Sequence, residues 1–153
     1  NLSAAKENNQ KYDIITAFHV IEHLQDPKSM LKDLSELLAE GGEIIIEVPN
    51  SDDALLTLYE NSDFQKFTYW SQHLFLFNSK TMEELIKQAG LQINWIKHVQ
   101  RYSLSNHLYW LAKGKPAGHK KWSFLNNNQL DQEYKHQLAA IGKTDTIIVG
   151  ISK

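Results

Sequence analysis

Apolar, β-branched runs alternate along the chain with longer segments in which leucines recur every three or four positions. The runs predict four strands, at 13–18, 43–48, 91–99 and 146–151. Between the first two, the leucine spacing over 27–38 predicts a helix that Asp26-Pro27 begins and Gly41-Gly42 follows. Strand, helix and strand with short joints form a βαβ unit, whose two strands run parallel.

The same periodicity predicts further helices, at 79–89, 104–112 and 130–141, with a shorter one near 54–59. Ser79 is expected to cap the first of them as part of a capping box. Residues 1–11 fit a helix tail or a loop. We expect a single domain over 1–153, with long insertions at about 51–78 and 101–143.

Composition excludes several classes of protein. The formal net charge of −2 gives no global basic field, so we expect no nucleic-acid partner. We expect no membrane partner either. The chain has no cysteine, which removes disulfides and thiolate metal sites. The polar N-terminus lacks the apolar core of a signal peptide, and no window approaches the ~20 apolar residues of a membrane helix. We therefore expect a cytoplasmic protein.

The first predicted strand ends in a cluster of polar side chains. His19, Glu22 and His23 follow Phe18 directly, before Asp26-Pro27 opens the helix. Open α/β sheets bind their ligands beyond the carboxyl ends of the strands. This stretch is therefore the best candidate for one wall of a ligand site.

In order and spacing these motifs resemble the second half of a class I S-adenosylmethionine-dependent methyltransferase. The resemblance rests on the strand that begins Tyr12-Asp13-Ile14-Ile15, the run 20–24 before Asp26-Pro27, the leucine-rich helix, Gly41-Gly42, and the strand ending Val48-Pro49-Asn50. It implies an α/β, Rossmann-like half-sheet of about four strands, mostly parallel with an antiparallel last strand, flanked by helices.

The glycine-rich cofactor loop of that family has no counterpart, because the seven glycines never form G-x-G-x-G. We therefore expect the chain to be the C-terminal part of a methyltransferase domain, a truncated domain whose own binding of S-adenosylmethionine is open. The strand at 13–18 would lack its usual neighbour. An apolar edge of this kind predicts a homo-oligomer formed through it.

The resemblance implies that Phe18 and His19 bind the cofactor. Some relatives carry Glu-x-x-Glu-His at this place and bind a divalent metal there. A metal set of His19, Glu22, His23 and His73 is therefore one alternative, with donors suited to a zinc-like ion. The other is that these side chains line the substrate or hold the loop, with no metal.

Aromatic side chains crowd around His73 in the first insertion. His73 is a candidate general base, with His23 as a second catalytic candidate, because imidazole titrates near neutral pH. The alternative for His73 is a loop histidine bound by backbone groups. Glu22, Asn50 and Tyr69 are candidate substrate contacts.

In the second insertion, Arg101 and Tyr102 directly follow the third predicted strand and are candidate substrate contacts. The basic turn at 113–121 is either a solvated loop or a clamp for an anionic substrate.

Two functions stay open. The first is methyl transfer from S-adenosylmethionine to a small molecule or a sugar or glycan precursor, as part of a longer enzyme. The second is a truncated, non-catalytic methyltransferase-like domain that acts through protein contacts at its exposed strand. Fold alone does not decide between them.

Overall fold

The structure is a computed structural model that describes residues 2–8, 10–69 and 72–153. The chain divides into two compact units. The first comprises residues 1–49, 74–97 and 147–153, and the second comprises residues 50–73 and 98–146. The second unit overlaps the two predicted insertions, and the single domain over 1–153 stays a prediction.

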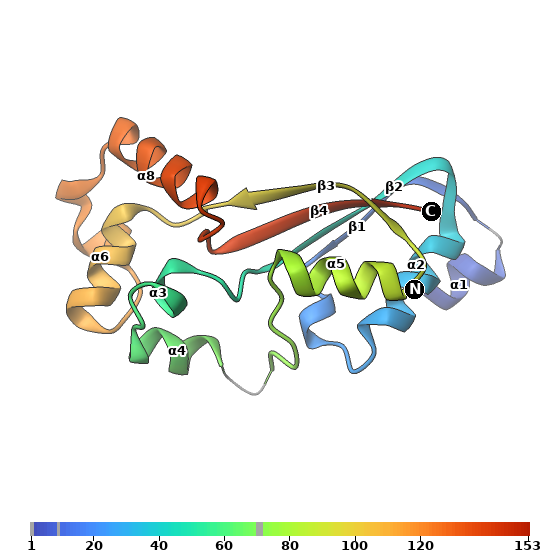
Figure 1. The fold of residues 1–153 in the computed structure, drawn as a ribbon, viewed down its shortest axis with the longest axis horizontal. Coiled ribbons are helices and arrows are strands. Elements are labelled where there is room, and N and C mark those ends of the chain that lie inside the picture. Colours follow the sequence, from blue (N-terminus) through green and yellow to red (C-terminus); the bar gives the residue numbers. More distant parts are fainter. Residues whose placement is uncertain (1, 9, 70–71) are drawn as a thin grey trace. The chain divides into compact units, whose positions relative to one another are not determined.

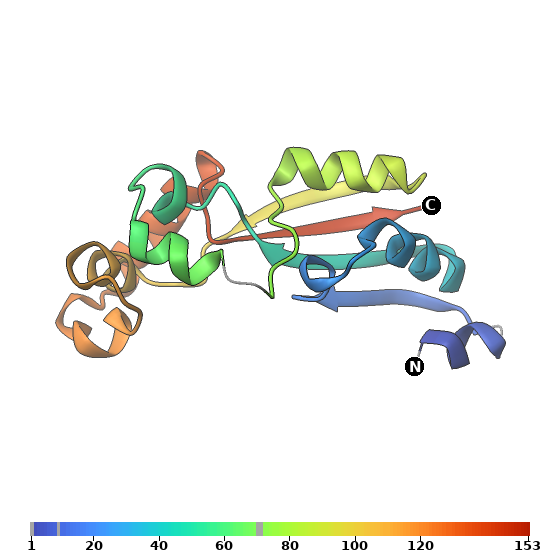
Figure 2. The ribbon, with the colours of Figure 1, turned by 90° about the horizontal axis from the view of Figure 1, so that it is seen from below.

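The first unit is built on a four-stranded sheet with the order β1-β2-β4-β3. The strands are β1 (Tyr12–Phe18), β2 (Leu38–Pro49), β3 (Gln92–Val99) and β4 (Thr146–Ser152). β1 and β2 are parallel, with Ile15 opposite Ile44 and Phe18 opposite Glu47. The arrows in Figure 2 show β4 running opposite to its neighbours. The predicted half-sheet is confirmed.

Helices of the first unit pack beside the sheet: α1 (Leu2–Glu7), α2 (Pro27–Leu37) and α5 (Ser79–Gln88), together with the 3-10 turn η1 (Ile21–His23). α2 and α5 lie side by side on one face (Figures 1 and 2). Between them and the sheet lies the apolar core, which includes Leu31, Ile44, Ile46, Val48, Met82, Ile86, Ile147 and Val149. Alternate β2 side chains enter this core because successive residues of a strand face opposite sides.

Two helix ends differ from the prediction. Gly41-Gly42 does not stop α2, which ends at Leu37, and β2 begins at once at Leu38. Both glycines lie within β2. Tyr12 pairs with Leu38 and Ile14 pairs with Glu43, so β2 has extra residues in this interval, and the two glycines are among them. Asn78 rather than Ser79 caps α5, because its side chain accepts the N–H of Thr81 while the Thr81 hydroxyl accepts the N–H of Asn78.

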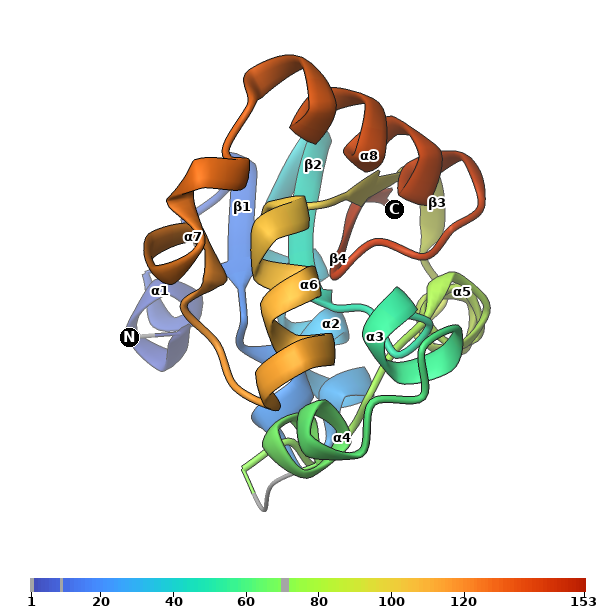
Figure 3. The same ribbon diagram turned by 90° about the vertical axis from the view of Figure 1, so that its left-hand side faces the viewer.

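Helices make up most of the second unit (Figure 3). They are α3 (Ala54–Thr57), α4 (Ser62–Thr68), α6 (Leu104–Lys113), α7 (Gly118–Lys121), the 3-10 turn η2 (Ser123–Leu125) and α8 (Asn128–Ala140). α4 was not predicted, because its short sequence is rich in aromatic residues and carries no apolar period. Phe64 and Phe67 of α4 pack against Trp110 of α6, with ring centroids 5.1 and 5.4 Å away.

Candidate functional site

The polar cluster that follows β1 is held by His19, whose backbone has a φ of 53°. Its N–H donates to the carbonyl of Glu47 at 2.9 Å, which continues the β1–β2 pairing by one residue. Its ring lies between two carboxylates, with Nε2 3.0 Å from Glu47 Oε1 and Nδ1 3.3 Å from Glu22 Oε1. The carboxyl ends of two parallel strands are thereby joined through one side chain.

Glu22 is the most unusual residue of this cluster. Its side chain is only 1% exposed, and among the described residues no hydrogen-bond partner lies near Oε2. A buried carboxylate oxygen normally requires a donor, because losing water costs free energy. Its backbone carbonyl accepts the N–H groups of Leu74 and Phe75 at 2.9 and 3.1 Å, which fixes the turn. Glu22 therefore presents a fixed oxygen that a ligand donor or a water molecule can satisfy.

Both ring nitrogens of His19 face carboxylate oxygens, which limits how hydrogen atoms can be placed between them. A neutral imidazole carries one N–H, so two hydrogen bonds to carboxylate oxygens require either an imidazolium or a protonated carboxyl group. His23 adds a second ring, with Nε2 3.8 Å from Glu22 Oε1. Phe18, at the end of β1, is 51% exposed. The strand end thus combines an exposed apolar ring with two imidazoles and two carboxylates.

The predicted metal set divides between the two units. The structure gathers His19, Glu22 and His23 in the first unit, together with Glu47, which the sequence did not single out. His73 belongs to the second unit, where its Nδ1 lies 3.0 Å from the carbonyl oxygen of Thr68. The metal set therefore stays a hypothesis, and the contact with Thr68 accords with a histidine bound by backbone groups.

The other substrate candidates lie in the second unit. Tyr69, at the end of α4, is 57% exposed. Asn50 is buried, and its amide donates to the carbonyl groups of Gly142 and Thr144 at 3.1 and 2.8 Å. In this structure the Asn50 amide serves to anchor the chain before β4, while its predicted substrate contact stays a prediction.

Arg101 and Tyr102 are organised around Asp145. Their N–H groups donate to Asp145 Oδ2 at 2.9 and 3.0 Å, and the Arg101 guanidinium lies 3.6 Å from Oδ1. The same guanidinium lies 5.8 Å from the centre of the Tyr102 ring. Arg101 is thus held beside a carboxylate and an aromatic ring, while its predicted substrate contact stays a prediction.

The sequence did not predict a buried row of hydrogen-bonded polar side chains in the second unit. Gln100 Nε2 lies 3.0 Å from His107 Nε2, and His107 Nδ1 lies 2.8 Å from the Tyr134 hydroxyl. Burial lowers the pKa of His107 to about 4 and raises that of Tyr134. Asp53 lies close enough to Tyr134 to add to this rise. The only sequence signal was a histidine within an apolar helix, which is weak evidence by itself.

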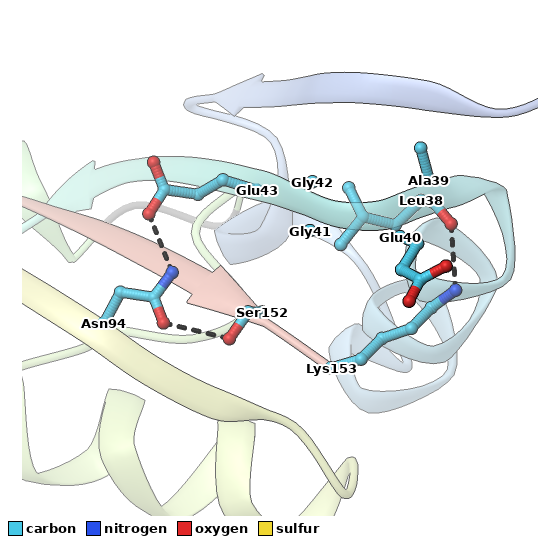
Figure 4. A pocket seen from close by; sticks show the side chains of 9 residues that line it. All are labelled: Leu38, Ala39, Glu40, Gly41, Gly42, Glu43, Asn94, Ser152 and Lys153. Carbon is cyan, nitrogen blue, oxygen red and sulfur yellow. Dashed lines mark hydrogen bonds between the residues drawn. The ribbon is translucent and has the colours of Figure 1, made fainter.

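A cavity of about 550 Å³ lies at the opposite end of β2 from the His19 cluster. It is lined by Leu38, Ala39, Glu40, Gly41, Gly42, Glu43, Asn94, Ser152 and Lys153 (Figure 4). Its polar groups bind one another, since Glu43 accepts from Asn94 at 2.9 Å and the Ser152 hydroxyl donates to Asn94 at 2.9 Å. These groups are already satisfied, so the His19 cluster remains the better candidate site.

Throughout the part of the chain that the structure describes, every helix is too short or too polar to cross a bilayer.

The amino-acid sequence is similar to known proteins of one family. Residues 1–94 match a family described as a methyltransferase domain. A ubiquinone biosynthesis O-methyltransferase of Acinetobacter baylyi is 28% identical over 114 residues, which cover 71% of this chain and 47% of that protein. An uncharacterized protein of Methanocaldococcus jannaschii is 29% identical over 84 residues, which cover 55% of this chain and 40% of that protein. The chain spans about half the length of these relatives.

Solved structures agree on the fold. A S-adenosylmethionine-dependent methyltransferase of Archaeoglobus fulgidus is 15% identical with a TM-score of 0.58, covering 99% of this chain and 64% of that one. A possible histamine N-methyltransferase of Thermotoga maritima is 18% identical with a TM-score of 0.55, covering 95% of this chain and 57% of that one. The family match over 1–94 shows that the chain belongs to the methyltransferase domain family, and the solved structures show that it has the fold of S-adenosylmethionine-dependent methyltransferases.

Proposed function

We propose that this chain contributes one wall of the catalytic site of a longer enzyme that transfers a methyl group from S-adenosylmethionine to a small molecule or a sugar or glycan precursor. The observation that carries the proposal is the cluster of His19, Glu22 and Glu47 where β1 and β2 end. Ligands of open α/β sheets bind at this edge. The length of the matched relatives supports a longer enzyme, since the chain covers 40–47% of them.

Phe18 and His19 would hold the cofactor. The exposed Phe18 ring offers apolar surface at the strand end, and the His19 ring is oriented by its two carboxylate partners. Glu22 Oε2 is a buried acceptor with no partner among the described residues, so it fits an N–H or O–H group of a bound ligand. When bound, S-adenosylmethionine supplies an electrophilic methyl group on a sulfonium sulfur.

The protein's main task in such a reaction is alignment of the reacting groups. His23 stands next to Glu22, and His73 is a second candidate, so either imidazole would accept the proton of an attacking hydroxyl or amine. We assign substrate contacts to Glu22, Asn50, Tyr69, Arg101 and Tyr102. These assignments follow from their places after strands and in the first insertion.

A second candidate function is a non-catalytic methyltransferase-like domain that acts through protein contacts. Ile14 and Phe18, on the outermost strand of the sheet, are 64% and 51% exposed, which favours association through this edge. Binding of the cofactor separates the two functions, because only the first requires it.

Titration calorimetry of the chain with S-adenosylhomocysteine tests the proposal. We expect saturable binding that weakens about tenfold in Phe18→Ala and in His19→Ala, while His119→Ala, an exposed histidine far along the chain, binds as the wild type does. Each variant is first checked for folding by circular dichroism. Absence of binding by folded wild-type protein would favour the non-catalytic function for this chain.

A further inference from the structure

The overall net charge of −2 conceals a strong local asymmetry. Between residues 101 and 130 the chain contains five basic residues and no Asp or Glu, which leaves 11 basic and 18 acidic residues elsewhere. Four of the five are lysines within nine positions: Lys113, Lys115, Lys120 and Lys121. All four are exposed. A weakly acidic chain thus carries one segment of concentrated positive charge.

These lysines lie on the segment of residues 113–125, which contains α7 and η2 and which we call the lysine corner. The structure anchors this corner to α6 through Asn106, a buried side chain. Asn106 Oδ1 accepts the N–H groups of Ala117 and Gly118, each at 3.1 Å, where Ala117 has a φ of 88°. The lysines are therefore presented on a backbone of fixed shape, which distinguishes the corner from a solvated loop.

Further contacts hold the rest of the corner. Asn126 donates to the carbonyl of His119 at 3.0 Å and accepts from the Ser105 hydroxyl at 2.8 Å. Trp122 packs edge-on against Tyr109 of α6, with ring centroids 5.2 Å apart. Gly118 lies so close to α6 that a Cβ there would be 2.6 Å from Asn106 Cα. The close packing requires glycine at this position.

An apolar side chain stands beside the lysines. Phe124 is 79% exposed, more than any other large apolar side chain that the structure describes. It follows Lys121 by three residues and its ring centroid lies 6.4 Å from that of Trp122. Exposing a phenyl ring to water is unfavourable, and lysines around an exposed aromatic ring are typical of proteins that bind the surface of a bilayer.

We propose that the lysine corner binds the surface of a membrane that contains anionic lipids. The lysine ammonium groups meet the lipid phosphates, and Phe124 enters the boundary between headgroups and acyl chains. Complementary charge and the exposed ring together favour this partner over a small anion, which binds better in a concave site with converging donors. Asp63 of α4 lies next to Gly114 of the corner. This association is independent of methyl transfer.

Vesicle co-sedimentation of the chain tests the proposal. We expect binding to vesicles of phosphatidylcholine with 30 mol% phosphatidylglycerol at low salt, and little binding to pure phosphatidylcholine. Lys120→Gln and Lys121→Gln should each weaken binding about fivefold, since a lysine near an anionic surface contributes roughly 1 kcal/mol. Phe124→Ser should weaken binding by a similar factor, and raised salt should weaken wild-type binding.

Matched variants provide the controls. Lys28→Gln and Lys32→Gln remove charge from α2 in the other unit, and Ile141→Ser removes an exposed apolar side chain after α8. All three should bind as the wild type does. The proposal is overturned if the folded protein does not bind anionic vesicles, or if the α2 variants weaken binding as much as the corner variants do. It is also overturned if millimolar pyrophosphate abolishes vesicle binding at constant ionic strength. Equal binding to single-stranded RNA, unaffected by Phe124→Ser, would also overturn it.

Discussion

The hydroxyl of Tyr134 lies 2.8 Å from His107 Nδ1, and the neighbouring amide decides which atom donates. Gln100 Oε1 accepts the N–H of Asp145 and its Nε2 donates to the carbonyl of Tyr102, so Nε2 also faces His107 as a donor. His107 Nε2 must therefore accept, and Nδ1 carries the proton that is donated to Tyr134. A neutral, oriented histidine links α6 to α8.

Replacing Tyr134 by Phe tests this link. We expect Tyr134→Phe to lower the free energy of unfolding by about 1–2 kcal/mol, because the buried Nδ1–H loses its acceptor. Tyr102→Phe is the control, since the Tyr102 side chain is 48% exposed. Urea unfolding followed by fluorescence measures both. Equal stability of Tyr134→Phe and wild type would show that the hydrogen bond contributes nothing.

The raised pKa of Asp53 leads us to expect that the stability of the protein depends on pH. Burial raises its pKa to about 7 from an ordinary value of 3.8, and the nearby charge of Asp145 adds to the rise. Because the folded state holds this proton more tightly than the unfolded state, the contribution of Asp53 to stability falls as pH rises from about 4 to 7. Asp53→Asn removes this loss, since the amide resembles the protonated carboxyl group.

We therefore expect Asp53→Asn to exceed the wild type in stability at pH 8, by on the order of a few kcal/mol at most, and to match it near pH 4. The measurement is urea unfolding of both proteins across this pH range. His107 has its pKa lowered to about 4 by burial, so its contribution is lost as pH falls below about 6.5 in both proteins and cancels in the difference. A difference independent of pH would contradict the assignment to Asp53.

Any side chain in place of Gly42 in β2 is expected to lower the free energy of unfolding. A Cβ there would lie 2.9 Å from the backbone oxygen of Asp13 and 3.0 Å from Leu38 Cδ1. Because backbone cannot move aside without disturbing β1–β2 pairing, Gly42→Ala should cost about 1–3 kcal/mol of unfolding free energy.

Gly90→Ala provides a comparison, since its Cβ would meet nothing within 4 Å and only the positive φ of 78° opposes the change. We expect thermal unfolding to show a smaller loss there, about 1 kcal/mol. A larger loss in Gly90→Ala than in Gly42→Ala would refute the steric argument.

We propose that copies of the chain associate through the outermost strand, β1. Ile14 is 64% exposed on this strand, so Ile14→Lys should weaken association by placing a charge on the edge. Sedimentation velocity over a range of concentrations measures the effect, with Ile141→Lys, another exposed isoleucine, as the control. A wild-type protein that stays monomeric at every concentration would rule out this partner.

The sequence predicted the half-sheet because β-branched runs and leucine spacing are local properties. The predicted helix between the first two strands made a βαβ unit, which predicted that β1 and β2 are parallel, and the structure confirms it. The sequence also placed His19, Glu22 and His23 together, since they are close in sequence. The sequence analysis did not predict α4. It also named Ser79 instead of Asn78 as the cap of α5, because the capping side chain alone decides at which of two adjacent residues the helix begins.

The amino-acid sequence by itself determined the family motif, the strand that ends in Phe18 and the polar residues after it. Only the tertiary structure brought Glu47 to His19 across 28 positions, left Glu22 Oε2 buried without a partner among the described residues, and joined Gln100, His107 and Tyr134 in one chain. Periodicity reports which face of an element is apolar. Contacts between polar side chains far apart in sequence depend on how the chain packs, and no local pattern encodes them.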